Sequence, residues 1–261
     1  GALVTVAKIY PAAALAVLCF VVSRSGAQEP TFMDAATHPG QGQFYSRALF
    51  STGAYGYETG DVEEHTAVLK LSYGLLPSLA LVVDGDFARM LGESHDDVGM
   101  SLATLRLKYR FLKKDLGPLN TWRASLLGGV SIPVGDEPLS SAHTFPRLGV
   151  VTTAILGRHG LNGQVEWRGY SGDPQSFSIN ASHLYRIAPA RYKLDTKGAW
   201  YTMVESLNDI SVDGDSRFDA ALGFLYEARQ WAWEISLRLP LSQDWRRDTE
   251  YRLITGFRLL L

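Results

Sequence analysis

An alternation of apolar and polar residues runs through most of the chain from position 43 onward. Residues 101–112 read SLATLRLKYRFL, in which every second residue from Ala103 to Phe111 is apolar and the residues between are polar or cationic. A period of two is that of a β-strand whose two faces meet different surroundings. A soluble sandwich would bury the apolar face against a second sheet. A transmembrane barrel would turn it to lipid and turn the cationic face to a lumen.

Segments with this alternation recur about twelve times. They lie near residues 43–57, 64–75, 78–89, 98–112, 120–134, 146–157, 160–171, 175–187, 191–206, 216–228, 230–241 and 249–261. No helical period of useful length follows residue 27, and an even number of antiparallel strands is typical of bacterial outer-membrane barrels. The pattern therefore predicts an all-β fold: a transmembrane antiparallel up-and-down β-barrel of about 12 strands over residues 43–261.

The connections between these segments fall into two sets. Short turns are expected near 74–78, 113–120, 157–160, 187–191 and 228–230, and generally longer, more acidic loops near 58–64, 93–97, 135–146, 171–175, 208–215 and 242–248. Short periplasmic turns opposite longer extracellular loops are typical of outer-membrane barrels. One group of aromatic residues lies beside the short turns (Tyr73, Tyr109, Phe111, Trp122, Tyr185, Tyr226 and Trp231) and another toward the loops (Phe87, Trp167, Phe177, Phe218 and Tyr251). Two aromatic belts are typical of membrane interfaces, which favours lipid outside and charge inside.

The amino-terminal residues predict a secretory signal peptide over 1–27. Lys8 precedes an apolar run over 12–22, and small residues end at Ala27, before Gln28. About eleven apolar residues are too few for a membrane anchor, which needs about 20. Cleavage would remove two of the 25 basic residues, none of the 27 acidic ones and the single cysteine, Cys19, leaving a net charge of −4. Residues 28–42 are expected to form a periplasmic N-terminal segment that folds into the mouth of the barrel or stays disordered.

Several stretches resemble one family. LSYGLLPSLALVV (71–83), DVGMSLATLRLKYRFLK (97–113), LLGGVSIPVGD (126–136) and AALGFLYEARQWAWEISLRLPL (220–241) occur in the order found in the MetA-pathway of phenol degradation family. The resemblance covers roughly 64–261, and the strand near 43–57 matches poorly. It implies an outer-membrane β-barrel transporter linked to the uptake of aromatic or other organic compounds. The family has no established catalytic residues to carry over.

Charged residues on the face opposite the apolar set are candidates for lining the lumen. Eight are basic and four acidic, namely Lys70, Asp84, Asp86, Arg106, Lys108, Arg110, Glu166, Arg168, Glu234, Arg238, Arg252 and Arg258. Such residues can line a water-filled path, or they can pair and fill the interior. Their basic excess predicts a preference for anions if the lumen conducts.

Catalytic and metal-binding patterns are not found in the sequence. The six histidines lack metal-ligand spacing, no nucleotide-binding GxxxxGK[ST] motif occurs, and no cofactor is expected. The acidic stretches GESHDD (92–97) and SVDGDS (211–216) fit either a Ca²⁺ or Mg²⁺ site or ordinary solvated loops.

Three functions follow as hypotheses. The first is a non-enzymatic outer-membrane channel for passive passage of a small solute, an aromatic or other organic compound. The second is a structural or interaction barrel with a closed lumen, and the third is a lipid-modifying outer-membrane enzyme. The expected partners are outer-membrane lipid, lipopolysaccharide and the solute, because neither composition nor charge points to nucleic acid. The oligomeric state is left open.

Overall fold

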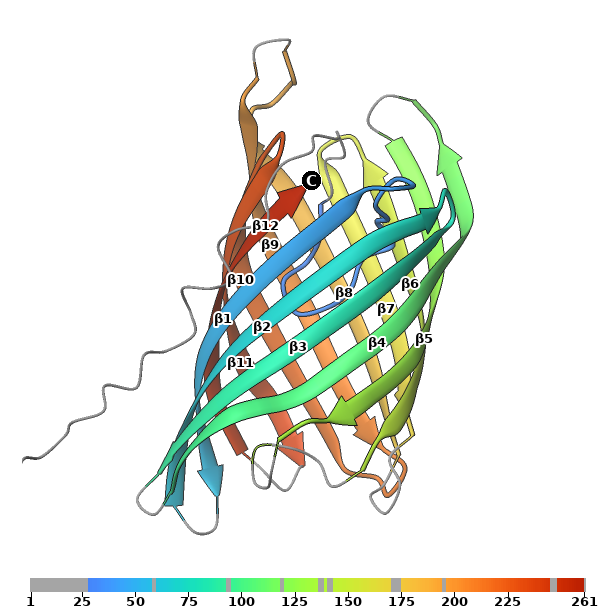
Figure 1. Cartoon of the computed structure of the whole chain (residues 1–261). Helices are drawn as coiled ribbons and strands as arrows, with labels where there is room; N and C mark the ends of the chain where they lie inside the picture. The colour runs from blue at the N-terminus through green and yellow to red at the C-terminus, as the bar shows by residue number, and fades with distance from the viewer. Residues whose placement is uncertain are drawn as a thin grey trace, which may run out of the picture.

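Twelve strands form one closed barrel in the part of the chain that the computed structural model describes (residues 28–57, 60–92, 95–117, 120–135, 139, 143–169, 175–193, 196–244 and 248–260). Each strand pairs antiparallel with the next, and β1 pairs with β12 (Figure 1). The strands are β1 (Phe44–Tyr57), β2 (Gly60–Leu76), β3 (Leu79–Gly92), β4 (His95–Asp115), β5 (Asn120–Pro133), β6 (Phe145–Leu156), β7 (His159–Arg168), β8 (Ser176–Ala188), β9 (Gly198–Ser211), β10 (Ser216–Ala228), β11 (Trp231–Asp244) and β12 (Asp248–Leu260). The predicted fold class is confirmed. The predicted signal peptide, 1–27, lies outside the described residues.

Helices long and apolar enough to cross a bilayer are absent from the described residues.

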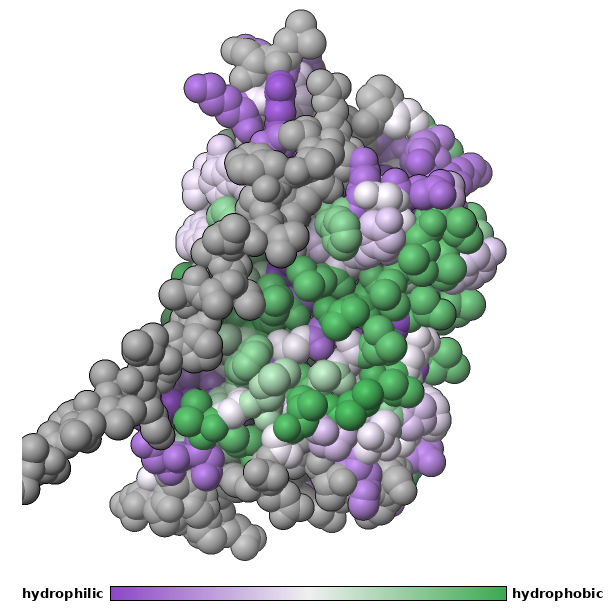
Figure 2. All heavy atoms as spheres, in the orientation of Figure 1, coloured by the Kyte–Doolittle hydropathy of each residue, from purple (hydrophilic) through white to green (hydrophobic). Residues whose placement is uncertain are grey.

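The barrel wall has an apolar outer face and a largely polar inner face. On β4, Leu105 and Leu107 are 47% and 48% exposed, whereas Arg106 between them is 2% exposed. Figure 2 shows hydrophobic residues gathered in a band across the middle of the visible face, with hydrophilic residues at both ends. Because closure pairs every strand on both sides, the backbone can satisfy its hydrogen bonds within a bilayer.

At each end of the barrel, some connections between strands differ in length from those that the sequence predicted. We call the end where β1 begins and β12 ends the terminus end, and the opposite end the loop end. At the loop end, β2 and β4 are 17 and 21 residues long, so only residues 58–59 and 93–94 separate β1 from β2 and β3 from β4. The prediction of long loops at these two places is therefore wrong. Strand pairing continues past the apolar alternation, because the outer face need not be apolar beyond the bilayer.

A second difference lies at the terminus end, between β8 and β9. The sequence predicted a short turn over 187–191, but β9 begins only at Gly198. Pro189 follows β8 directly and has no N–H to donate to a neighbouring strand. The pairing register of β8 with β9 also shifts between Arg186 and Ala188. The ladder ends here, and the chain forms a longer connection.

Aromatic side chains of β9–β12 contact one another on the outside of the barrel near the terminus end. The ring centroids are 4.9 Å apart for Trp200 and Tyr226, 5.2 Å for Tyr226 and Trp231, and 5.6 Å for Trp231 and Phe257. Such rings suit the interface between hydrocarbon and water. They form a continuous part of the aromatic belt expected at this end.

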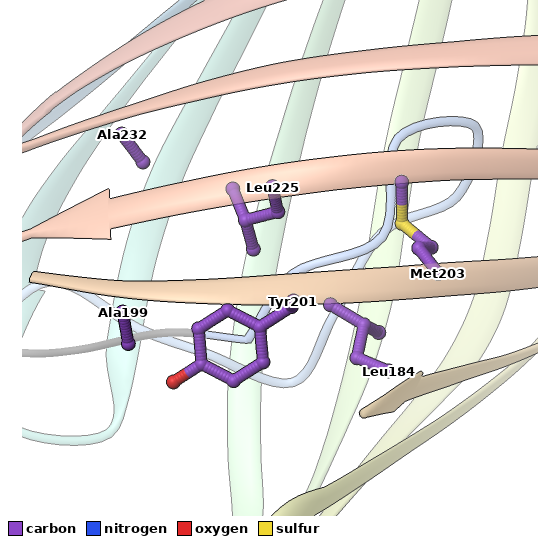
Figure 3. Close-up of a cluster of buried hydrophobic side chains, with 6 residues drawn as sticks. All are labelled: Leu184, Ala199, Tyr201, Met203, Leu225 and Ala232. Carbon is purple, nitrogen blue, oxygen red and sulfur yellow. The ribbon is translucent and has the colours of Figure 1, made fainter. Parts of the chain in front are cut away.

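Part of the inner wall is apolar. A buried cluster on β8–β11 faces the interior near the terminus end (Figure 3) and consists of Leu184, Ala199, Tyr201, Met203, Leu225 and Ala232. The sequence analysis did not predict this cluster, because it assigned apolar alternation to the lipid face alone. The cluster occupies interior volume that a water-filled path would need.

Candidate functional site in the barrel lumen

Residues 28–39, which we call the plug, run through the terminus-end half of the barrel interior. Figure 1 shows this first described stretch, in blue, looping within the ring of strands. Thr31, Met33 and Ala36 are no more than 5% exposed. Residues 28–42 were expected at the mouth of the barrel or as a disordered terminus. The structure instead places 28–39 inside the lumen.

The chain leaves the lumen beside β2 through a close backbone approach. The amide of Gly42 donates to the Gly74 carbonyl at 2.8 Å, and the amide of Gly74 donates to the Gln43 carbonyl at 3.0 Å. A Cβ atom at Gly74 would lie 2.0 Å from the Gly40 carbonyl oxygen. Position 74 therefore requires glycine for the plug to turn back into β1 at this place.

Asp34 is the charged centre of the plug. Its Oδ1 accepts from Lys70 Nζ at 2.6 Å and its Oδ2 from Arg106 Nη1 at 2.7 Å. Burial disfavours the charged carboxylate, but the positive charges of Arg106, Lys70 and Lys108 outweigh it and hold the pKa of Asp34 well below its ordinary value. Arg106 also donates to Asp84 at 2.6 Å. Two wall side chains, Lys70 and Arg106, therefore bind the plug through one carboxylate, and Asp84 joins this network through Arg106.

A second anchor surrounds Glu234. Arg47 and Arg258 both form ion pairs with this carboxylate, which is fully buried. The same two guanidiniums reach the plug: Arg47 Nη2 donates to the Pro30 carbonyl at 2.7 Å and Arg258 Nη2 donates to the Glu29 carbonyl at 2.8 Å. This triad of Arg47, Glu234 and Arg258 therefore connects β1, β11 and β12 with the start of the plug.

Glu205 binds the plug backbone. Its side chain accepts from the amides of Thr31 and Phe32, each at 3.0 Å. Lys108 similarly donates to the Ala35 carbonyl, and the Gln164 side-chain oxygen accepts from the Asp34 amide at 2.8 Å. Wall side chains thus satisfy plug backbone groups that would otherwise be buried without partners.

His38 lies at the far end of the plug and is buried. Its Nδ1 donates to the Pro39 carbonyl at 2.6 Å. Burial lowers the pKa of His38 to about 4, with help from the positive charges of Arg110 and Lys108 and against the opposing effect of the bond to Pro39. The imidazole is therefore neutral at pH 7.

Little space remains beside the plug. The cavity between it and the walls of β1–β3 has a volume of about 40 Å³. That is room for about one water molecule and far too little for an organic solute. With the plug in place, this side of the terminus-end half of the lumen is occluded.

Beyond the plug, toward the loop end, four arginines and three carboxylates form a partly exposed network that we call the charged belt. Arg147 and Arg168 bind Glu166 at 2.6 and 3.0 Å. Arg217 lies 3.0 Å from Asp209 and 3.3 Å from Asp219. Arg238 pairs with Asp219, and its Cζ lies 5.6 Å from the ring centroid of Phe32 in the plug. The belt has one more positive than negative charge. It consists of Arg147, Glu166, Arg168, Asp209, Arg217, Asp219 and Arg238.

The structure separates the twelve sequence-predicted residues into four groups. Five contact the plug through hydrogen bonds: Lys70, Arg106, Lys108, Glu234 and Arg258. Glu166, Arg168 and Arg238 belong to the charged belt, and Asp84 pairs with Arg106. Arg252 donates to Ser51 and Thr66, Arg110 donates to the Pro77 carbonyl in a turn, and Asp86 is half-buried. Their role as the lining of a solute path stays a prediction.

Sequence reasoning missed several residues of this site. Arg47 and Glu205 lie on strands whose inward face was not assigned, and Asp34 lies in a segment with no period at all. The signal for Asp34 was compositional. Residues 35–42 contain alanine, glycine and proline, which fit a narrow lumen, but small residues are equally common in disordered termini.

Metal-binding side chains do not gather among the described residues, where no group of three or more His, Cys, Asp or Glu could hold an ion. Of GESHDD, residues 93–94 and the His95 side chain lie outside the description, and Asp96 pairs with Arg89. SVDGDS forms the turn between β9 and β10. His159 and His183 contact each other at 3.0 Å on exposed positions.

Comparisons with known proteins identify the fold. No family model and no curated protein matches the chain. Among solved structures, the COG4313 outer membrane channel from Pseudomonas putida F1 has a TM-score of 0.60 at 13% identity, covering 88% of this chain and 100% of that one. LpxR from Salmonella typhimurium (TM-score 0.48, 11% identity, 82% and 99% covered) and the β domain of the Bordetella autotransporter BrkA (0.46, 9%, 85% and 100%) are more distant. The closed barrel with its apolar outer face is thus of the outer-membrane type, and the chain lies in a bacterial outer membrane.

Proposed function

We propose that this chain is a non-enzymatic outer-membrane channel for passive passage of a small solute, and that the plug closes it until released. The observation that carries the proposal is the polar character of the plug's attachment. Asp34 binds Lys70, the Glu29 carboxylate lies 3.7 Å from Arg258, and the plug backbone donates to Glu205. Groups of this kind can be rehydrated when the plug leaves, so closure is reversible.

The charged belt supports passage of anions. Its arginines are 12–28% exposed. A ring with excess positive charge concentrates anions at a constriction. The resemblance to the MetA-pathway of phenol degradation family implies an aromatic or other organic compound as solute. A small organic anion satisfies both considerations. Lipopolysaccharide and lipid are the surroundings we propose for the outer face.

A closed structural barrel is the alternative, and the buried ion pairs favour it. Arg47 and Glu234 are 2.8 Å apart with side chains at most 4% exposed. Breaking such a pair by removing one partner is strongly unfavourable. If the plug is as firmly held as this triad, the lumen never opens. The long strands at the loop end would then bind another protein.

Conductance in planar bilayers tests the proposal. We expect a chain that begins at Gln28 to be closed most of the time and a variant lacking residues 28–39 to conduct steadily. Heat-modifiable migration on gels verifies that the variant has folded. A folded deletion variant that does not conduct would contradict the channel and favour the closed barrel.

A reversible crosslink provides the matched control. A chain that begins at Gln28 has no cysteine, and Ala36 of the plug belongs to one buried cluster with Val151 of β6. In the double variant Ala36→Cys, Val151→Cys, oxidation should abolish channel openings and reduction should restore them in the same membrane. Openings that persist after verified crosslinking would mean that the current bypasses the plug.

A further inference from the structure

A second cavity opens at the terminus end of the barrel, on the other side of the lumen from the 40 Å³ space beside the plug. Its volume is about 490 Å³, and it is lined by residues of β4–β6, of β8–β10 and of the connections beside them, and by the first plug residue. Among the lining residues are Gln28, Arg123, Arg186, Tyr192, Tyr201 and Glu227. A small organic molecule fits a space of this size. None of the contacts that anchor the middle of the plug lies here.

Arg186 on β8 is the unusual member of this cavity. It is 2% exposed, and its Nε and Nη1 have no hydrogen-bond partner. The other three arginines buried to this degree in the described chain, Arg47, Arg106 and Arg258, each form an ion pair with a carboxylate. Because a guanidinium does not deprotonate in proteins, Arg186 holds a buried positive charge that has no ion-pair partner among the described residues.

The groups around Arg186 fix it in place without neutralising it. Its Cζ lies 4.1 Å from the ring centroid of Tyr192. The Tyr192 hydroxyl is 2.7 Å from the Tyr201 hydroxyl, to which the Gln28 side-chain amide donates at 3.5 Å. Glu227 lines the same cavity. A stacked guanidinium beside two tyrosine hydroxyls is a ready set of donors for an oxyanion.

We propose that this cavity binds a small molecule carrying a carboxylate or phosphate group, with Arg186 as its counter-charge and Tyr192 and Tyr201 beside its organic part. The inference deepens the proposed function, on which it rests for the role of the ligand as the transported solute. Binding itself requires neither conductance nor movement of the plug.

Titration calorimetry tests the site on a chain that begins at Gln28, refolded in detergent, with benzoate and inorganic phosphate as separate probes. We expect at least one probe to bind, and Arg186→Met to weaken its binding about tenfold or more, since the lost hydrogen bonds involve charged groups. Arg191→Met is the matched control, because Arg191 is exposed and outside the cavity lining. This variant should bind the probe as tightly as the parent chain does. Loss of benzoate binding alone identifies an organic carboxylate, and loss of phosphate binding alone identifies a phosphate compound.

The inference would be overturned if the parent chain bound neither benzoate nor phosphate. It would also be overturned if Arg186→Met bound the probe as tightly as the parent chain does. If Arg186→Met does not refold, Glu227→Gln replaces it. Removing that negative charge should tighten binding of the anion several-fold, and unchanged binding would overturn the inference as well. Conductance of the variant lacking residues 28–39 is measured independently, so loss of this site and loss of the channel proposal are distinguishable.

Discussion

Replacing Asp34 by asparagine should open the channel without changing its wall. Asparagine has nearly the same shape but cannot balance the charges of Lys70 and Arg106, whose nitrogens lie 2.6 and 2.7 Å from the carboxylate. Removing one partner of a buried ion pair costs about 3–5 kcal/mol. Arg106 keeps Asp84 at 2.6 Å, and the side chains of Lys70 and Asp34 are 17% and 16% exposed, so the lower end applies. About 3 kcal/mol lowers the ratio of docked to released plug about a hundredfold.

Single-channel recording measures this ratio directly as the fraction of time that the channel is open. We expect Asp34→Asn to raise the open fraction about a hundredfold where the parent is mostly closed. The control is Asp213→Asn, which changes net charge equally in an exposed turn at the loop end. An open fraction unchanged in Asp34→Asn, in a protein whose plug-deleted form conducts, would refute the reasoning, because the Asp34 contacts would then not hold the plug.

Three further changes test the wall, the exit of the plug and its titration. Leu105→Arg places a charge in the hydrocarbon and should destabilise the refolded barrel by about 2–4 kcal/mol near the midplane in urea titrations, whereas Leu105→Ile should not. Gly74→Ala puts a Cβ 2.0 Å from the Gly40 carbonyl and should raise the open fraction, while Gly85→Ala, with no atom within 4 Å of its Cβ, should not. The pKa of His38 is about 4 in the docked plug and about 6.5 once hydrated, so the released plug binds the proton first. Docking should be strongest above pH 6.5 and weaken as the pH falls to 4; an open fraction constant over this window, or one that His38→Gln leaves equally pH-dependent, would contradict the assignment.

The barrel wall could be predicted from sequence because the bilayer constrains every lipid-facing position. Residues such as Leu105, Arg106 and Leu107 must alternate in polarity, because one face of the strand contacts hydrocarbon and the other face contacts the charged interior. The same physics explains why the strand ends were missed. Glu63 and Glu64 continue β2 outside the bilayer, where the outer face can be polar and the alternation stops although strand pairing continues.

The plug could not be predicted in the same way, because its position depends on side chains far away in the sequence. Asp34 meets Lys70 and Arg106, 36 and 72 residues later. No local period records such a meeting, and an acidic residue near a terminus is ordinarily solvated. Arg186 was missed for a different reason: it occupies a regular inward position of β8, and only the absence of a partner in three dimensions distinguishes it.

The wall charges themselves indicate that the plug can be removed. When the plug leaves, Glu234 keeps both Arg47 and Arg258, and Arg106 keeps Asp84. The groups that lose a partner are few, chiefly Lys70, Lys108 and Glu205, and water entering the vacated lumen would hydrate them. A plug held by apolar contacts alone would leave a larger apolar area of wall facing water, at a cost proportional to that area. A plug attached mainly through polar contacts, on a wall whose charges remain mostly paired, therefore limits the free-energy cost of opening. A gate requires this property, and a permanent filling does not.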